Sequence, residues 1–258
     1  MIILEQLALF SASLVANTLS ALAGGGAGLL QLPILLFLGL TFSSALATHK
    51  LASVALGVGA TLRHLRENRL NRLFALYILA CGLPGVVSGA LIILKFHDQW
   101  AKLCLGVLIL GLGIYSLFKS ELGQYHQPRH RNPLGLLAGG IVLFSIGCLN
   151  GSLTSGTGLF VTIWLVRWFG LDYKTAVAYT LILVGLFWNG LGALTLWFQA
   201  PIKWEWLPAL LLGSALGGYV GAHLSLIKGN KLVKRCFEAI TFAVGIKLIM
   251  DALLFFKA

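Results

Sequence analysis

The sequence predicts an all-α protein, a polytopic bundle of membrane-spanning helices made of two inverted repeats. Of its 258 residues, 58% are hydrophobic and only 10% are charged, whereas soluble domains carry about 25% charged residues. The hydrophobic residues form runs of membrane length that are separated by short polar loops. Two glycine-rich stretches about half the chain apart interrupt these runs in the same way, which predicts a glycine-broken first helix in each repeat.

Ten apolar segments follow one another along the chain. Eight are long enough to cross about 30 Å of hydrocarbon as helices, and two are short half-helices. The long segments are 2–23, 44–62, 73–94, 101–118, 134–150, 174–198, 204–227 and 235–256, and the short ones are 28–39 and 157–169. Each half therefore has the same plan, in which a long helix, a break and a short helix precede three long helices.

The first apolar segment has features of a signal peptide, because it ends in Ala21-Leu22-Ala23. However, no Lys or Arg precedes its apolar run, and Glu5 lies there instead. The run is also longer than the usual apolar core of a signal peptide. We therefore expect an uncleaved first helix.

The repeats show in the spacing of their glycines. Three pairs of equivalent glycines lie 130 to 132 residues apart: Gly28 and Gly158, Gly39 and Gly170, and Gly89 and Gly221. The polar stretch between the halves contains Pro128 and Pro133. We therefore expect a first transmembrane repeat over residues 1–118, a cytoplasmic linker over 119–133 and a second transmembrane repeat over 134–258.

The positive charges indicate the orientation of the helices. The formal net charge is +11, and most Lys and Arg residues lie in four loops: 63–72, 119–133, 167–174 and 228–235. The positive-inside rule explains this pattern better than nucleic-acid binding does. If these loops are cytoplasmic, each half makes five passes, the halves are inverted and both termini lie outside. Re-entrant short segments with parallel halves are the alternative, and they fit the charges less well.

The glycine breaks are the predicted binding site. They expose backbone polar groups that lipid cannot satisfy, so they must face protein or an aqueous cavity. A matched pair of such breaks is typical of the substrate site of a secondary transporter, and helix N-termini attract anions. The alternative is that the glycines only permit tight turns and close packing. The candidate substrate-binding residues at the breaks are Gly25, Gly26, Gly28, Gln31, Asn150, Ser155, Gly156, Thr157 and Gly158.

Two adjacent ionisable residues lie about two turns into the segment 44–62. A cation at the centre of a spanning helix costs about 2.5–3.5 kcal/mol on insertion scales, so Lys50 is expected to face a cavity or a partner, unless its side chain reaches the interface. A histidine can titrate near neutral pH, so His49 is either a structural or a proton-relay group. The equivalent residues of the second half are Thr180 and Leu181, so we expect a chemically asymmetric site.

A third candidate cation is Lys247, in the last long segment. Asp251 lies four residues further on the same helix face, where the two side chains can form an ion pair. This pair is either structural or part of the transport pathway.

No motif in the sequence predicts an enzyme. The chain has no nucleophile elbow, P-loop, HExxH motif or paired carboxylates, so we expect no catalytic residues and no cofactor. Its cysteines are scattered and contain no CxxC motif, which indicates packing residues and no metal site: Cys81, Cys104, Cys148 and Cys236.

These residues resemble the sulfite exporter TauE/SafE family over nearly the whole chain. The resemblance depends on GGGAGLLQLP at 24–33, on LG and SALATHK within 38–50, and on N-G-x-x-x-S-G-T-G-L-F at 150–160, together with the two-half layout. It implies an inner-membrane protein that moves small anions outward, notably sulfite and organosulfonates.

The sequence thus predicts a secondary active transporter that exports a small oxyanion across the inner membrane. The substrate would bind between the two breaks, with protons as the candidate coupling ion and a homodimer as the candidate assembly. The alternatives are an anion channel, a transporter of another small carboxylate or sulfur-containing anion, and a membrane-embedded enzyme or its assembly partner.

Overall fold

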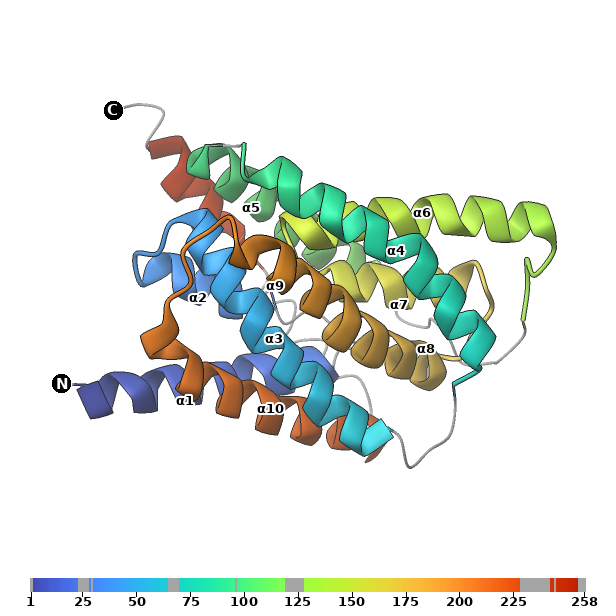
Figure 1. The fold of residues 1–258 in the computed structure, drawn as a ribbon, viewed down its shortest axis with the longest axis horizontal. Helices are drawn as coiled ribbons and strands as arrows, with labels where there is room; N and C mark the ends of the chain where they lie inside the picture. Colours follow the sequence, from blue (N-terminus) through green and yellow to red (C-terminus); the bar gives the residue numbers. More distant parts are fainter. Residues whose placement is uncertain are drawn as a thin grey trace.

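The structure is a computed structural model, and it describes residues 2–22, 28, 30–64, 70–95, 97–118, 128–227, 242–243 and 245–254. Within these residues the secondary structure is helical and contains no strand. The all-α prediction is therefore confirmed. Figure 1 shows the helices packed as one bundle, in which α1 begins and helix 245–254 ends at the left of the view.

The helix boundaries lie within a few residues of the predicted ones. The helices are α1 (Ile2–Leu22), α2 (Gln31–Phe37), α3 (Phe42–His64), α4 (Arg72–Ile93), α5 (Asp98–Leu117), α6 (Pro133–Ser152), α7 (Thr157–Arg167), α8 (Tyr173–Tyr179), α9 (Asn189–Trp197) and α10 (Leu207–Ile227). Among the described residues, six helices are long and apolar enough to cross a membrane. Helix α5, of 20 residues, and helix 245–254 occupy the other two predicted spans, and they pack on each other through Gly106 and Gly245.

The predicted helix 174–198 contains a feature that the sequence did not predict. Between α8 and α9 the chain forms a π-helix of nine residues, η3 (Thr180–Trp188), without interrupting the helical rod. π-Helices are rare, and they are frequent at functional sites. Helix α3 crosses η3 in backbone contact, since a Cβ atom on Gly57 would lie 2.4 Å from the Gly185 carbonyl carbon.

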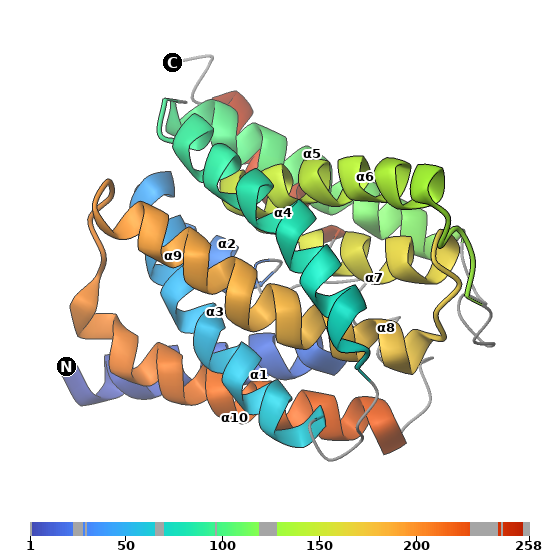
Figure 2. The same cartoon turned by 45° about the vertical axis from the view of Figure 1, so that its right-hand side comes forward.

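Equivalent helices of the two halves make equivalent contacts. Helix α1 packs along α10, and α6, the counterpart of α1, packs along α4, the counterpart of α10 (Figure 2). Glycines allow both approaches, and their backbone partners are also equivalent: Gly217 with Leu14, Gly221 with Thr18, Gly85 with Phe144, and Gly89 with Cys148. The Gly-xxx-Gly spacings on α4 and α10 therefore permit close helix packing.

A second pair of equivalent contacts lies at opposite ends of the bundle. The Asn71 backbone N–H donates a hydrogen bond of 2.7 Å to Tyr179 Oη, and the Lys203 backbone N–H donates one of 3.0 Å to Thr48 Oγ1. In Figure 1, α1 and α6 run in opposite directions, as do α4 and α10. These contacts support a two-fold relation between halves of opposite orientation, and inversion across the membrane stays a prediction.

Candidate functional site

The two glycine breaks meet inside the bundle. Gly28 of the first break lies against Thr154 and Ser155 of the second, and Ser155 Oγ donates a hydrogen bond of 2.5 Å to the Gly28 carbonyl oxygen. A Cβ atom on Gly28 would lie 2.3 Å from the Thr154 methyl carbon, so glycine permits this approach. Gly156 has a φ of 69°, in the left-handed region that glycine adopts without strain.

The helices after the breaks differ in what they offer to a ligand. Helix α2 begins at Gln31 rather than near Gly28, and it has only seven residues, so few aligned peptide dipoles are available at its start. Helix α7 begins at the predicted position, with Gly156 as its N-cap and Thr157 and Gly158 in its first turn. Of the candidate residues in the first break, Gly25 and Gly26 lie outside the described residues.

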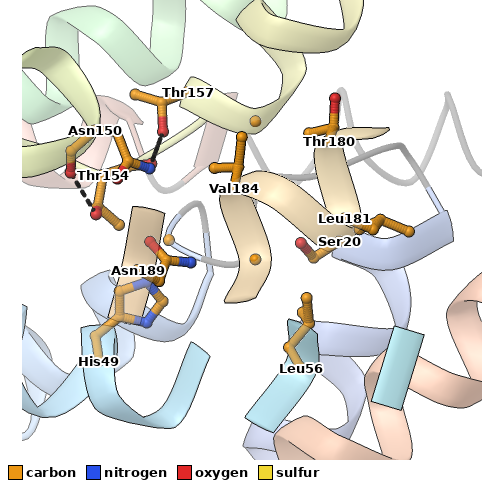
Figure 3. A pocket seen from close by; sticks show the side chains of 13 residues that line it. Ser20, His49, Leu56, Asn150, Thr154, Thr157, Thr180, Leu181, Val184 and Asn189 are labelled. Carbon is orange, nitrogen blue, oxygen red and sulfur yellow. Dashed lines mark hydrogen bonds between the residues drawn. The ribbon is translucent and has the colours of Figure 1, made fainter. Parts of the chain in front are cut away.

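A narrow cavity of about 30 Å³, here called the central cavity, lies where the breaks meet (Figure 3). Three pairs of equivalent positions from the two halves line it: Ser20 with Asn150, Gly28 with Gly158, and His49 with Thr180. The other lining residues are Leu56, Thr154, Thr157, Leu181, Val184, Gly185 and Asn189, so much of one wall belongs to η3. A cavity of this volume holds about two water molecules.

Lys50 lies fully buried behind the polar wall of the central cavity. Its Nζ donates to the Asn150 carbonyl oxygen and to Asn150 Oδ1, both at 2.6 Å, and to Asn189 Oδ1 at 3.1 Å. Asn150 Nδ2 donates to Thr157 Oγ1 at 2.9 Å, so Asn150 joins Lys50 to the start of α7. In the part of the chain that the structure describes, no carboxylate lies within ion-pair distance of Lys50.

His49 connects the central cavity to a buried polar chain. Its Nδ1 lies 2.8 Å from Gln31 Oε1, and its Nε2 lies 3.1 Å from Ser53 Oγ. Gln31 Nε2 in turn donates to Ser13 Oγ at 2.9 Å and to Ser214 Oγ at 3.2 Å. The chain of hydrogen bonds therefore runs from the cavity to the interface between α1 and α10.

The structure does not bring Lys247 to this site. Its side chain is 57% exposed, and its Nζ lies 3.9 Å from Asp251 Oδ2 and 5.0 Å from the centre of the Phe37 ring. The ion pair considered from the sequence is thus present, on the surface of helix 245–254. The central cavity has one nearby lysine among the described residues, Lys50.

Sequence reasoning missed several hydrogen-bonding residues of the site, including Ser53, which contacts His49. Asn189 binds Lys50, while Ser13 and Ser214 hold Gln31. Asn189 could have been found, because an amide in the middle of an apolar segment needs a partner in the bundle. Single serines such as Ser13 and Ser214 carry no such signal, since the hydroxyl of a serine in a spanning helix can donate its hydrogen bond to a carbonyl of the same helix.

The site has the chemistry of an anion receptor. Amide and hydroxyl groups and the N-terminus of α7 surround the central cavity, and none of its lining residues is acidic. A buried ammonium lies directly behind them. Such an arrangement favours a small negatively charged ligand over a cation.

Comparisons with known proteins give matches over nearly the whole chain. The protein-family model described as "Sulfite exporter TauE/SafE" matches residues 9–248. A "Probable membrane transporter protein" of Haemophilus influenzae is 30% identical over 244 residues, which cover 94% of each chain. The "Probable membrane transporter protein YfcA" of Escherichia coli K12 is 28% identical over 247 residues, covering 95% of this chain and 89% of that protein. No solved structure matches the sequence significantly.

Proposed function

The chain belongs to the sulfite exporter TauE/SafE family of membrane transporters, and we propose that it is a secondary active transporter that exports a small oxyanion, such as sulfite or an organosulfonate. Its relatives are named as transporters rather than enzymes, and its long apolar helices make it a multi-pass membrane protein. The proposal places it in the inner membrane with both termini outside. The observation that carries it is the buried Lys50 beside the central cavity.

Within the described part of the protein, no carboxylate lies close enough to Lys50 to neutralise its charge. Its three hydrogen bonds go to neutral oxygens, and the nearest groups are the amides of Asn150 and Asn189. A cation buried in this way is costly, and an opposite charge beside it lowers that cost. An anion in the central cavity would supply that charge, with Asn150 and Asn189 turning to share Lys50 with it.

The meeting of the two breaks supports alternating access. The central cavity takes equivalent residues from both halves, so a rocking of one repeat against the other would open it to either side in turn. At about 30 Å³ the cavity is smaller than an oxyanion needs. Binding therefore requires its walls to separate, and η3 forms the wall that contains the non-α-helical backbone.

His49 is the group proposed to couple protons to transport. It lines the central cavity and continues into the buried chain of Gln31 and Ser13. A histidine changes charge near neutral pH in water, and its proton would compensate the charge of a bound anion. The chain of hydrogen bonds gives that proton a polar path away from the substrate.

Transport of radiolabelled sulfite in proteoliposomes tests the proposal. We expect saturable sulfite flux that depends on the protein and changes with an imposed proton gradient, because a carrier binds one substrate per cycle. Flux without saturation or coupling would instead identify an anion channel. No flux of sulfite or of any organosulfonate would contradict the proposal.

The change Asn189→Asp tests the role of Lys50 as the counter-charge of the substrate. The new carboxylate has the shape of the amide and lies where Asn189 Oδ1 is 3.1 Å from Lys50 Nζ, so it would pair with Lys50 permanently. We expect the KM for the anion to rise at least tenfold while thermal stability does not fall. The control is Gln199→Glu, at an exposed position outside the cavity. An unchanged KM in Asn189→Asp would show that Lys50 does not bind the anion.

A further inference from the structure

A second and much larger cavity lies at the end of the bundle where α4 and α6 begin, which is the right-hand end in Figure 1. It has a volume of about 510 Å³ and lies where α4, α6 and α8 begin. We call it the vestibule, and the lining residues that matter here are Leu73, Phe74, Tyr77, Arg131, Leu136 and Tyr179. The loops at this end are the predicted cytoplasmic ones. The next residue after Tyr179, Thr180, already lines the central cavity.

Arg131 is the cation of the vestibule. Its guanidinium carbon lies 3.6 Å from the centre of the Phe74 ring and 5.3 Å from that of Phe169. Within the described residues it makes no hydrogen bond or ion pair. Partial burial lowers the pKa of Arg131, yet a guanidinium stays protonated at neutral pH. Its five N–H groups are therefore available to a ligand.

The chain around Arg131 is held in place by its neighbours. The Arg129 backbone N–H donates to the Phe169 carbonyl oxygen at 3.1 Å. His130, with a φ of 52°, stacks on Trp168 and bonds to its carbonyl oxygen at 2.8 Å. Asn132 then caps α6 through the Gly135 backbone N–H at 3.0 Å. Arg131 is thus presented to the vestibule by a fixed segment, which is what a binding site requires.

The walls of the vestibule combine the starts of three helices with apolar surface. Three helices start beside it, each with a side-chain cap: Asn71 on α4, Asn132 on α6 and Asp172 on α8. The carboxylate of Asp172 bonds to the Thr175 backbone N–H at 3.0 Å and to Thr175 Oγ1 at 2.6 Å. Phe74, Tyr77 and Leu136 provide the apolar part.

The opposite end of the bundle presents different side chains at the equivalent positions. At the positions equivalent to Leu73 and Phe74 stand Glu205 and Trp206. Trp206 Nε1 donates to Glu5 Oε1 at 2.8 Å, and Glu205 forms an ion pair of 2.7 Å with Lys203. The two equivalent ends therefore differ: one presents Arg131, which has no ion pair among the described residues, whereas the other presents Glu5 and the ion-paired Glu205.

We propose that the vestibule binds an organic anion that joins a sulfonate or carboxylate to an apolar group. The guanidinium of Arg131 binds the charged oxygens in its planar fork, and the aromatic walls take the apolar group. Its volume lies within the range of small-molecule sites. Capture of the substrate here, ahead of the central cavity, rests on the proposed function, whereas binding of the anion at Arg131 does not.

Binding of benzenesulfonate to the purified chain in phosphatidylcholine nanodiscs tests this site. We expect saturable binding by calorimetry, at least tenfold weaker in Arg131→Gln and within twofold of wild type in the matched control Arg129→Gln, which lies outside the vestibule lining. If Arg131→Gln does not fold, Leu73→Glu serves, because Leu73 is 80% exposed at the cavity and tolerates a polar group. It introduces the carboxylate of the opposite end and should also weaken binding at least tenfold.

Two further measurements separate this inference from the proposed transport function. Benzenesulfonate binding should persist in Lys50→Met, even where transport is lost, since Lys50 does not line the vestibule. It should also persist when phosphatidylglycerol is added to the nanodiscs. Binding that is unaffected by Arg131→Gln, that disappears in Lys50→Met, or that phosphatidylglycerol abolishes would overturn the proposal, the last by showing that a lipid headgroup fills the site.

Discussion

Replacing Lys50 with Met is expected to reduce anion transport in proteoliposomes at least 100-fold while the protein stays folded. Met has a similar length and no charge, so it fills the same space without the buried ammonium. Asn150 Oδ1 and Asn189 Oδ1 lose their donor, which costs about 1–3 kcal/mol for a buried acceptor. Removing an uncompensated buried cation offsets that cost. Initial rates of sulfite flux and a thermal melt of the same preparation measure the two effects separately.

Lys247→Met is the matched control for this experiment. Lys247 also lies in a predicted spanning segment, but its side chain is 57% exposed and pairs with Asp251. Ion pairs of this exposed type contribute about 0–1 kcal/mol, so we expect near wild-type transport and stability. If Lys50→Met retained transport and Lys247→Met lost it, the binding site would have to lie at helix 245–254. This result would contradict the central cavity as the binding site.

The sequence was sufficient to predict most of the helices. Apolar runs in lipid must form helices because no other open structure satisfies the backbone, so length and hydrophobicity placed α3 and α6 within a few residues of their observed ends. Periodicity cannot reveal a π-helix, because η3 differs from an α-helix only in its hydrogen bonds. The start of α2 was also misplaced, since a glycine marks a break but does not say how many residues the break occupies.

The site was predicted in outline and not in its contacts. Lys50 was found because a cation in an apolar run is costly wherever it lies, and His49 was found beside it. What the sequence cannot show is which polar residues of distant helices converge on them. Asn189 is 139 residues away from Lys50, and the packing of α3 against η3 and α9 brings the two residues together. Lys247 had the same sequence signal as Lys50, and packing alone separates the two.

Substitutions of glycine at the interfaces between the two halves are expected to cause the largest losses of stability. A Cβ atom on Gly89 would lie 2.0 Å from the Cys148 carbonyl oxygen, and one on Gly221, the equivalent residue, would lie 2.3 Å from the Thr18 carbonyl oxygen. Both obstacles are backbone atoms, so a larger side chain must force α4 from α6 or α1 from α10. We expect Gly89→Leu and Gly221→Leu each to destabilise the protein by about 3 kcal/mol or more, at the upper end of overpacking effects.

The matched control for both changes is Gly111→Leu on α5, where an added Cβ atom meets nothing within 4 Å. Leu favours a helix over Gly by about 0.8 kcal/mol, so this variant should be at least as stable as wild type. Thermal melts of detergent-solubilised protein, followed by size-exclusion chromatography, compare the three. Because the two interfaces are equivalent, Gly89→Leu and Gly221→Leu should lower the melting temperature to a similar extent. A large loss in only one of them would mean that the halves do not share the same packing, and it would argue against a rocking motion between equivalent repeats.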